Sequence, residues 1–138
     1  MTRFTEVVKV DDRGRIVIPG STRKVMKLAS GTRLMMMVDD EKSEIRLTPF
    51  IDQSAKPVQI RVLMSDTQGA LAKIAAAIGD MGINLIYEEA HVLRKGVQAE
   101  WQVIADLAPM KEALTLEQIK ARILATKVAQ EVEIQKYD

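Results

Sequence analysis

The order of apolar patterns in the second half of the chain constrains the fold most strongly. From residue 57, apolar residues recur at every second position, which predicts a half-buried strand. From residue 71, apolar residues recur at spacings of three and four, which predicts a helix that ends at Gly82. The apolar residues of the strand are Val58, Ile60, Val62 and Met64, and those of the helix are Leu71, Ile74, Ile78 and Met81.

The remaining elements of this half follow from turn and capping signals. Residues 83–93 and 97–107 are predicted strands, joined by a hairpin turn at residues 94–96. A second helix is predicted to open at Thr115, because Gln118 three positions later completes a capping box. Val128, Val132 and Ile134 indicate a last strand. The order βαββαβ predicts a ferredoxin-like α+β fold, with two helices on one face of an antiparallel sheet.

A polar stretch at residues 52–57 separates this half from a different N-terminal pattern. Small polar residues and Pro57 interrupt the apolar periodicity there, which predicts a linker between a module at 1–51 and a module at 58–138. Residues 1–56 hold 11 Lys and Arg against 8 Asp and Glu, whereas residues 57–138 hold 9 against 11. A basic first module is typical of proteins that bind polyanions.

The N-terminal module is predicted to contain two hairpins around a short helix. Residues 5–10 and 15–18 are the first pair of strands, with Gly14 at a turn position that needs positive φ. A helix over residues 21–28, closed by Gly31, follows Pro19. Residues 33–38 and 44–47 form the second hairpin. About 50 residues in this arrangement cannot bury enough apolar surface alone, so we expect an obligate dimer, with Met35 to Met37 in its core and interface.

The string Val-Lys-Val-Asp-Asp-Arg-Gly-Arg-Ile-Val-Ile-Pro at residues 8–19, followed by Arg23, Lys24 and Leu28, resembles the AbrB/SpoVT/MazE swapped-hairpin family. The resemblance covers roughly residues 3–50, and Gly20-Ser21-Thr22 departs from the stronger helix formers of relatives. It implies an intertwined β-barrel homodimer that binds double-stranded DNA. The implied DNA-binding residues are Lys9, Arg13, Arg15, Arg23 and Lys24, with Arg3 in the leading arm as a weaker candidate.

These side chains suit DNA for physical reasons. A two-stranded ribbon enters the major groove, where the planar fork of Arg can bridge phosphate oxygens or the O6 and N7 atoms of guanine. Lys supplies a point charge for phosphates. The alternative is that these residues are solvated surface charges, as most Lys and Arg are.

The second module resembles the ACT family of amino-acid-sensing domains, through residues 62–72 and the Gly-Ile-Asn-Leu string at residues 82–85. Gln68 replaces the Pro that is usual in the loop of that family. The resemblance implies an amino acid bound at a dimer interface, between the loop after the first strand and the start of the partner's second strand. The implied ligand-binding residues are Asp66, Thr67, Gln68, Gly69, Ala70, Leu71 and Asn84.

The residues of that loop also have a structural interpretation. Asp66 or Thr67 can cap the helix that follows, and Asn84 can end a turn. A domain of this type can also serve for dimerisation alone. The functional interpretation has its own physical basis, because a helix N-terminus offers free N–H groups to a carboxylate and Gly69 allows close approach of the backbone.

Composition removes several classes of function. The chain has no cysteine, which excludes a disulfide framework, Cys-ligated zinc and a thiol nucleophile, and the single His91 excludes a multi-histidine metal site. We therefore expect no catalytic residues, no metal, no cofactor and no enzymatic activity. There is no apolar run of about 18 residues and no signal-peptide pattern at the start, so we expect a cytoplasmic protein without membrane contact.

The sequence thus favours a transcription regulator, a homodimer or higher homo-oligomer, whose DNA binding responds to an amino acid. Two alternatives stay open at this point. One is an antitoxin-like protein whose second half neutralises a toxin, although such segments are usually disordered before binding. The other is a regulatory subunit that docks on a biosynthetic enzyme through its ACT-like sheet and does not bind DNA.

Overall fold

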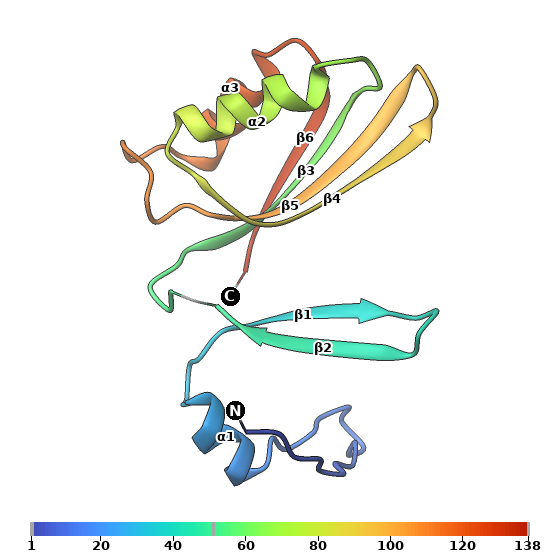
Figure 1. Ribbon diagram of the computed structural model, residues 1–138. Helices are drawn as coiled ribbons and strands as arrows, with labels where there is room; N and C mark the ends of the chain where they lie inside the picture. Colours follow the sequence, from blue (N-terminus) through green and yellow to red (C-terminus); the bar gives the residue numbers. More distant parts are fainter. Residues whose placement is uncertain (1, 51, 138) are drawn as a thin grey trace. The chain divides into compact units, whose positions relative to one another are not determined.

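The chain divides into two compact units, Met1–Gln53 and Ser54–Asp138. The computed structural model describes residues 2–50 and 52–137, in which three helices and two antiparallel sheets are found (Figure 1). The division falls within the stretch at residues 52–57 that was expected to be a linker. No helix in the described part of the chain is both long enough and apolar enough to cross a membrane.

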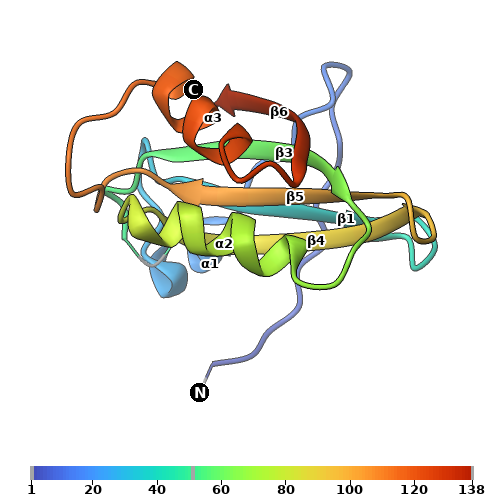
Figure 2. The ribbon, with the colours of Figure 1, turned by 90° about the horizontal axis from the view of Figure 1, so that it is seen from above.

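The C-terminal unit has the predicted βαββαβ order. Its four strands form one antiparallel sheet in the order β4-β5-β3-β6, which is the ferredoxin-like arrangement. Both helices lie on the same face of this sheet (Figures 1 and 2). The elements are β3 (Pro57–Ser65), α2 (Ala70–Asp80), β4 (Asn84–Arg94), β5 (Gln98–Asp106), α3 (Leu116–Leu124) and β6 (Ala129–Lys136). The α+β prediction for this unit is confirmed.

The core of this unit lies between the sheet and its two helices. Alternate side chains of β3 and β5 point toward the helices and are buried, because successive residues of a strand face opposite sides of the sheet. Trp101, at 1% exposure, is the largest of the buried side chains and is a packing residue. The cluster includes Val58, Ile60, Val62, Met64, Ile74, Ile78, Trp101, Val103, Ala105, Ile119, Ile123 and Val132.

Local signals determine where the two helices start and end. The capping box of α3 is present: the Gln118 amide donates to Thr115 Oγ1 (3.1 Å) and the Thr115 amide donates to Gln118 Oε1 (2.9 Å). After α2, Gly82 has φ of 79°, and a Cβ on it would lie 3.0 Å from the Lys111 backbone nitrogen. Only glycine fits there without displacing the chain.

One position of α2 differs from the prediction. Leu71 was expected on the buried face, but it is 39% exposed, and Ala70 is buried in its place. The buried line of α2 is Ala70, Ile74 and Ile78, at spacings of four residues, and Leu71 lies one residue round the helix from it. Leu71 therefore contributes exposed apolar surface near the start of α2.

The N-terminal unit contains α1 (Gly20–Met26) and a hairpin of β1 (Leu34–Asp39) and β2 (Glu44–Pro49). The second predicted hairpin is thereby confirmed, and the side chains of β1 alternate, with Met36 exposed. The expectation that Gly31 closes the helix was wrong. Lys27 ends it by taking a left-handed conformation (φ 55°), and the Leu28 amide then donates to the Arg23 carbonyl (2.9 Å).

The first predicted hairpin is present only as its turn. Gly14 has the expected positive φ of 75°, but no strand is formed within residues 2–19. Several apolar side chains of this segment are exposed to solvent, with Val7 96% and Val17 74% exposed. A two-stranded ribbon is marginal without a further strand, and the described residues offer these arms none. The swapped-hairpin barrel, which needs a second copy, stays a prediction.

Candidate functional site

The loop that carries two of the predicted DNA-binding residues is organised by the Asp11 carboxylate. Its Oδ1 accepts hydrogen bonds from the backbone amides of Arg13 (2.9 Å) and Arg15 (2.8 Å). Its Oδ2 accepts from Arg15 Nε (2.8 Å). The Asp11 amide donates to the Arg15 carbonyl (2.9 Å) and the Gly14 amide to the Asp11 carbonyl (3.1 Å), which closes the turn.

This arrangement has an electrostatic consequence. The hydrogen bond from the Arg15 backbone amide, followed by the one from its side chain, lowers the pKa of Asp11 below its usual value. The ionised Asp11 carboxylate accepts these hydrogen bonds and holds the loop closed. Sequence reasoning did not assign Asp11 a role, although an Asp three residues before a turn Gly is a known signal for a side chain that bonds its own loop.

The other basic candidates fall into two groups. Arg23 Nη1 donates to the Ile18 carbonyl (2.7 Å), which anchors α1 to the segment before it. The side chains of Lys9, Arg13 and Lys24 form no hydrogen bond or ion pair within the described residues. Three candidates are thus free to meet an anion, whereas Arg15 and Arg23 are held in place and keep further N–H donors.

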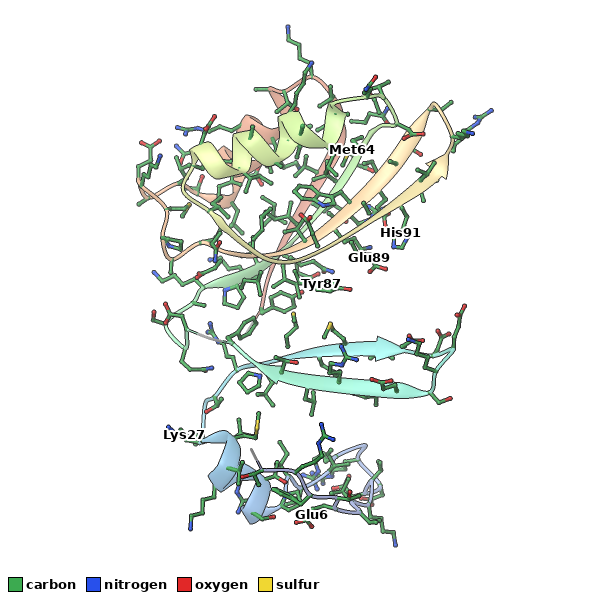
Figure 3. All side chains as sticks on the ribbon, in the orientation of Figure 1. Glu6, Lys27, Met64, Tyr87, Glu89 and His91 are labelled. Atoms are coloured by element: carbon green, nitrogen blue, oxygen red, sulfur yellow. The ribbon has the colours of Figure 1, made fainter. Side chains whose placement is uncertain are left out.

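Glu6 links the leading arm to α1. Its Oε1 accepts a hydrogen bond from Ser21 Oγ (2.6 Å), and Figure 3 shows Glu6 in this unit. The sequence analysis did not single out Glu6 or Ser21, because the two are 15 residues apart and no local pattern connects them.

An apolar groove of about 180 Å³ lies in the N-terminal unit. Residues from the leading arm, α1 and the β1–β2 hairpin line it, and nearly all of them are aliphatic. The lining residues are Val8, Ile16, Val17, Ile18, Pro19, Thr22, Met26, Leu28, Leu34, Leu47 and Pro49. The groove and the exposed apolar side chains of the arm are both in contact with water. Burial of this surface would be favourable.

In the C-terminal unit, the predicted ligand loop leads into an uncapped helix. Gly69 is the N-cap of α2 with φ of 85°, and no side chain caps this end. Neither Asp66 nor Thr67 therefore caps α2, which was the structural alternative to a role in ligand binding. The Ala70 amide donates to the Thr67 carbonyl (3.2 Å), so the amides of Leu71 and Ala72 are the first-turn N–H groups without an acceptor among the described residues.

The Asp66 side chain connects this loop to the β4–β5 hairpin. Its Oδ2 accepts from the Gly96 amide (2.7 Å), and the Asp66 amide donates to the Val97 carbonyl (3.2 Å). On the other side, the Ser65 amide donates to the Val128 carbonyl (3.0 Å). The loop at residues 65–69 is therefore tied to the hairpin and to the segment before β6.

Replacement of Asp66 should release the hairpin turn. In Asp66→Ala, we expect hydrogen exchange at the Gly96 amide to become roughly tenfold faster, because a hydrogen bond to a charged group contributes about 1.5 kcal/mol or more. Amide exchange followed by NMR measures this. Thr67→Ala is the control, since Thr67 Oγ1 makes no hydrogen bond among the described residues, and unchanged exchange in Asp66→Ala would contradict the link.

Asn84 does not lie with the other predicted ligand residues in one chain. It begins β4 opposite Asp106, whereas the loop at residues 66–69 follows Ser65, which lies opposite Gln98 at the other end of the sheet. Gln98 and Asp106 are eight residues apart along β5, which is about 26 Å of strand. Ala70 is buried and Leu71 is exposed beside the loop. Asn84 can join this group only from a second copy.

The face of the sheet away from the helices is polar. Arg61 pairs with Glu100 (2.8 Å) and reaches Glu133 at 3.6 Å. His91 Nε2 lies 3.0 Å from Glu89 Oε1, and Figure 3 shows both side chains on this face with Tyr87. Within the described residues, no group of three or more Asp, Glu or His side chains is arranged to hold a metal ion.

No protein-family model matches the sequence, and no curated protein matches it. Among solved structures, the chain is similar to an unknown protein from Galdieria sulphuraria, with a TM-score of 0.51 and 14% identity over 61% of this chain. The chain spans 46% of the length of that protein, and the likeness shows the fold alone.

Two further solved structures are similar at 14% identity. One is the C-terminal domain of the MgtC protein from Mycobacterium tuberculosis, with a TM-score of 0.49 over 64% of this chain and 94% of that domain. The other is the ACT domain from GTP pyrophosphokinase of Chlorobium tepidum, with a TM-score of 0.46 over 58% of this chain and 97% of that domain.

Proposed function

We propose that the chain is a homodimeric DNA-binding transcription regulator that responds to a small ligand, an amino acid. Its N-terminal unit is of the AbrB-like swapped-hairpin type and contacts double-stranded DNA. Its C-terminal unit is of the ACT-like type and holds the ligand. The observation that carries the proposal is the arm at residues 7–18, in which exposed apolar side chains (Val7, Val8, Val10, Ile16 and Val17) flank the basic residues Lys9, Arg13 and Arg15.

Dimerisation follows from the apolar part of this arm. Val7, Val10 and Val17 are exposed, and the nearby apolar groove has no cover among the described residues. The arm of a second copy supplies the strands that one hairpin lacks and covers both grooves symmetrically. The gain is the burial of aliphatic surface and the satisfaction of backbone groups in a shared sheet.

DNA contact follows from the basic part. The closed loop at residues 11–15 presents Arg13 and Arg15 at its surface, and the Arg15 side chain is 65% exposed. A loop held rigid by Asp11 loses little conformational entropy when it meets a phosphate or a guanine edge. Lys9, Arg23 and Lys24 add charge for the DNA backbone, and a dimer doubles each contact.

Ligand binding uses the start of α2. The uncapped N-terminus suits the carboxylate of an amino acid, and Gly69 allows the backbone to approach it closely. Asn84 of the partner subunit supplies an amide for the rest of the ligand. Because Asn84 comes from a second copy, ligand binding and the arrangement of the dimer depend on each other. The ligand thereby changes the spacing of the two DNA-binding arms.

The sensing half predicts a specific effect of one side chain. In the wild-type chain, one or more of the standard amino acids should change the affinity for DNA by about 5- to 150-fold, the usual range of allosteric coupling. Asn84→Ala should abolish this change and leave DNA binding in place. Titration of a genomic fragment recovered by pull-down, with and without each amino acid, measures both effects.

The control for this experiment is Gln135→Ala, an exposed amide on β6 that should keep the response. If no amino acid changes DNA affinity, the sensing half is wrong. If the chain binds no DNA at low salt, the DNA-binding half is wrong, and the regulatory subunit of an enzyme becomes the better account.

A further inference from the structure

Residues 53–56 form the connector between the two units, and hydrogen bonds hold both of its ends. At the first end, Gln53 Oε1 accepts from the Arg33 amide (2.9 Å), and Gln53 Nε2 donates to the Phe50 carbonyl (3.0 Å). Arg33 precedes β1 and Phe50 follows β2, and the Phe50 amide donates to the Arg33 carbonyl (3.3 Å). Gln53 is therefore fastened to the base of the β1–β2 hairpin of its own unit.

The second end of the connector is fastened to the sheet of the C-terminal unit. The Lys56 amide donates to Asp106 Oδ1 (2.8 Å), and the Lys56 carbonyl accepts from the Leu107 amide (3.0 Å). Lys56 directly precedes β3, whereas Asp106 and Leu107 lie at the end of β5. One side-chain bond and one backbone bond thus hold the residue that enters the sheet.

The part of the chain between these two fastened residues is short. Ser54 and Ala55 separate Gln53 from Lys56, and Ala55 is 5% exposed. The chain from Gln53 to Lys56 reaches at most about 11 Å even when fully extended. A flexible linker would absorb a movement of Lys56, but a connector this short passes the movement on to Gln53.

Asp106 is the residue that controls the second end. It is 7% exposed, and it is the one polar or charged residue in the buried class among the residues that the structure describes. Its Oδ1 accepts from the Ala108 amide (2.9 Å) as well as from the Lys56 amide. Burial of an acidic side chain is costly unless hydrogen bonds compensate for the lost water. Its contribution is therefore to hold two backbone segments and not to fill the core.

Asp106 also lies next to a predicted ligand residue. In the sheet it is opposite Asn84 of β4 on one side and opposite Pro57 of β3 on the other. Neighbouring strands are about 4.8 Å apart. The start of β4 and the end of the connector are thus the two neighbours of Asp106 across the sheet.

We propose that Asp106 couples the ligand-binding unit to the connector, a step that rests on the proposed function. When a ligand at Asn84 shifts the start of β4, the end of β5 moves with it, because the two strands share backbone hydrogen bonds. The Asp106 side chain carries this shift to Lys56, and the short connector carries it to the N-terminal unit. Asp106 is a positioning residue that contacts neither ligand nor DNA, and only a measured coupling can establish such a route.

A longer connector tests the transmission while every hydrogen bond described above keeps its donor and acceptor. We insert Gly-Ser-Gly-Ser between Ser54 and Ala55, which adds a flexible segment. Each standard amino acid is then titrated, with DNA affinity as the readout. The ligand-induced change, about 5- to 150-fold in the wild-type chain, should fall below about twofold. DNA affinity without ligand, and amino acid affinity measured by calorimetry, should stay near wild type.

The control is the same insertion between Glu41 and Lys42, in the exposed turn between β1 and β2, which should keep the response. A full response in the chain with the longer connector overturns the proposal, because the signal would then pass without a short connector.

Substitution of Asp106 tests the residue itself. Asp106→Ala should also lower the response below about twofold, and hydrogen exchange at the Lys56 amide should become roughly fivefold faster or more. Asp106→Asn keeps an acceptor oxygen and should retain the response, which a purely electrostatic role would not allow. Asp80→Ala removes an exposed acidic side chain at the end of α2 and should change neither measurement. A full response in Asp106→Ala, or its loss in Asp106→Asn, overturns the role of these hydrogen bonds. If Asp106→Ala does not fold, the longer connector decides.

Failure of this inference and failure of the proposed function give different results. If no amino acid changes the DNA affinity of the wild-type chain, the proposed function fails, and the coupling role of Asp106 fails with it. If the wild-type chain responds and the chain with the longer connector responds equally, the proposed function stands and only the coupling role fails.

Discussion

Replacement of Arg15 by alanine should weaken DNA binding by between roughly 30-fold and 10⁴-fold while the dimer stays intact. An Arg contact to a base edge contributes about 1–3 kcal/mol, and a homodimer loses two such contacts. If Arg15 contacts phosphate instead, the loss appears in the salt dependence. The slope of log affinity against log salt should then become shallower by about 1.8, which is two contacts at about 0.9 each. Titration at several salt concentrations distinguishes the two cases.

Two further variants separate DNA contact from loop structure. Arg46→Ala removes an exposed Arg that pairs with Glu44 on β2, outside the candidate surface, and should leave affinity nearly unchanged. Asp11→Ala removes the acceptor of three hydrogen bonds but keeps the Arg15 charge, so affinity should fall less and the salt slope should hold. If sedimentation shows that Arg15→Ala is monomeric, Arg15 is a structural residue and the DNA assignment loses its main support.

Replacement of Trp101 by alanine should destabilise the C-terminal unit by about 3–5 kcal/mol, the usual loss for a buried tryptophan. Trp101 is 1% exposed in the middle of β5 and packs between the sheet and its helices. A domain is usually stable by only about 5–15 kcal/mol, so this single change should bring the unit close to unfolding. Urea denaturation followed by far-ultraviolet circular dichroism measures the free energy of unfolding. This signal does not depend on tryptophan fluorescence, which the substitution removes with the single Trp of the chain.

The matched control is Leu124→Ala at the end of α3, where the side chain is 36% exposed. A partly exposed aliphatic residue loses less apolar contact, and the expected cost is about 1 kcal/mol. Equal destabilisation by the two changes would show that the sheet and helix interface is not the main source of stability in this unit.

Much of the C-terminal fold could be predicted because its signals are local. Alternation along Val58 to Met64 and the Thr115 capping box depend only on neighbours in the chain, and both are present as predicted. Leu71 was misplaced because a spacing of three fits the apolar pattern as well as a spacing of four. The position at which the helix starts decides which of its residues face the sheet. Gly69 is the N-cap of α2, and Ala70 is therefore buried with Ile74 and Ile78.

The first hairpin shows the opposite case. Gly14 and the Asp11 turn form locally, but a strand needs a partner for its backbone groups, and the arms at residues 5–10 and 15–18 find none among the residues that the structure describes. The composition of these arms predicts strands, but the described residues of one copy supply no strand with which they pair. The role of the basic residues they carry, like that of the ligand loop, stays a prediction.

The sequence by itself determined the types of element, their order in the C-terminal unit and the glycines that allow its turns, because these depend on contacts between near neighbours. Only the tertiary structure decided that Asp66 bonds Gly96, that Glu6 bonds Ser21, and that Asn84 and the ligand loop lie at opposite ends of the sheet. These relations join residues far apart along the chain. Such relations depend on how segments distant in the chain pack together, and no local pattern encodes them.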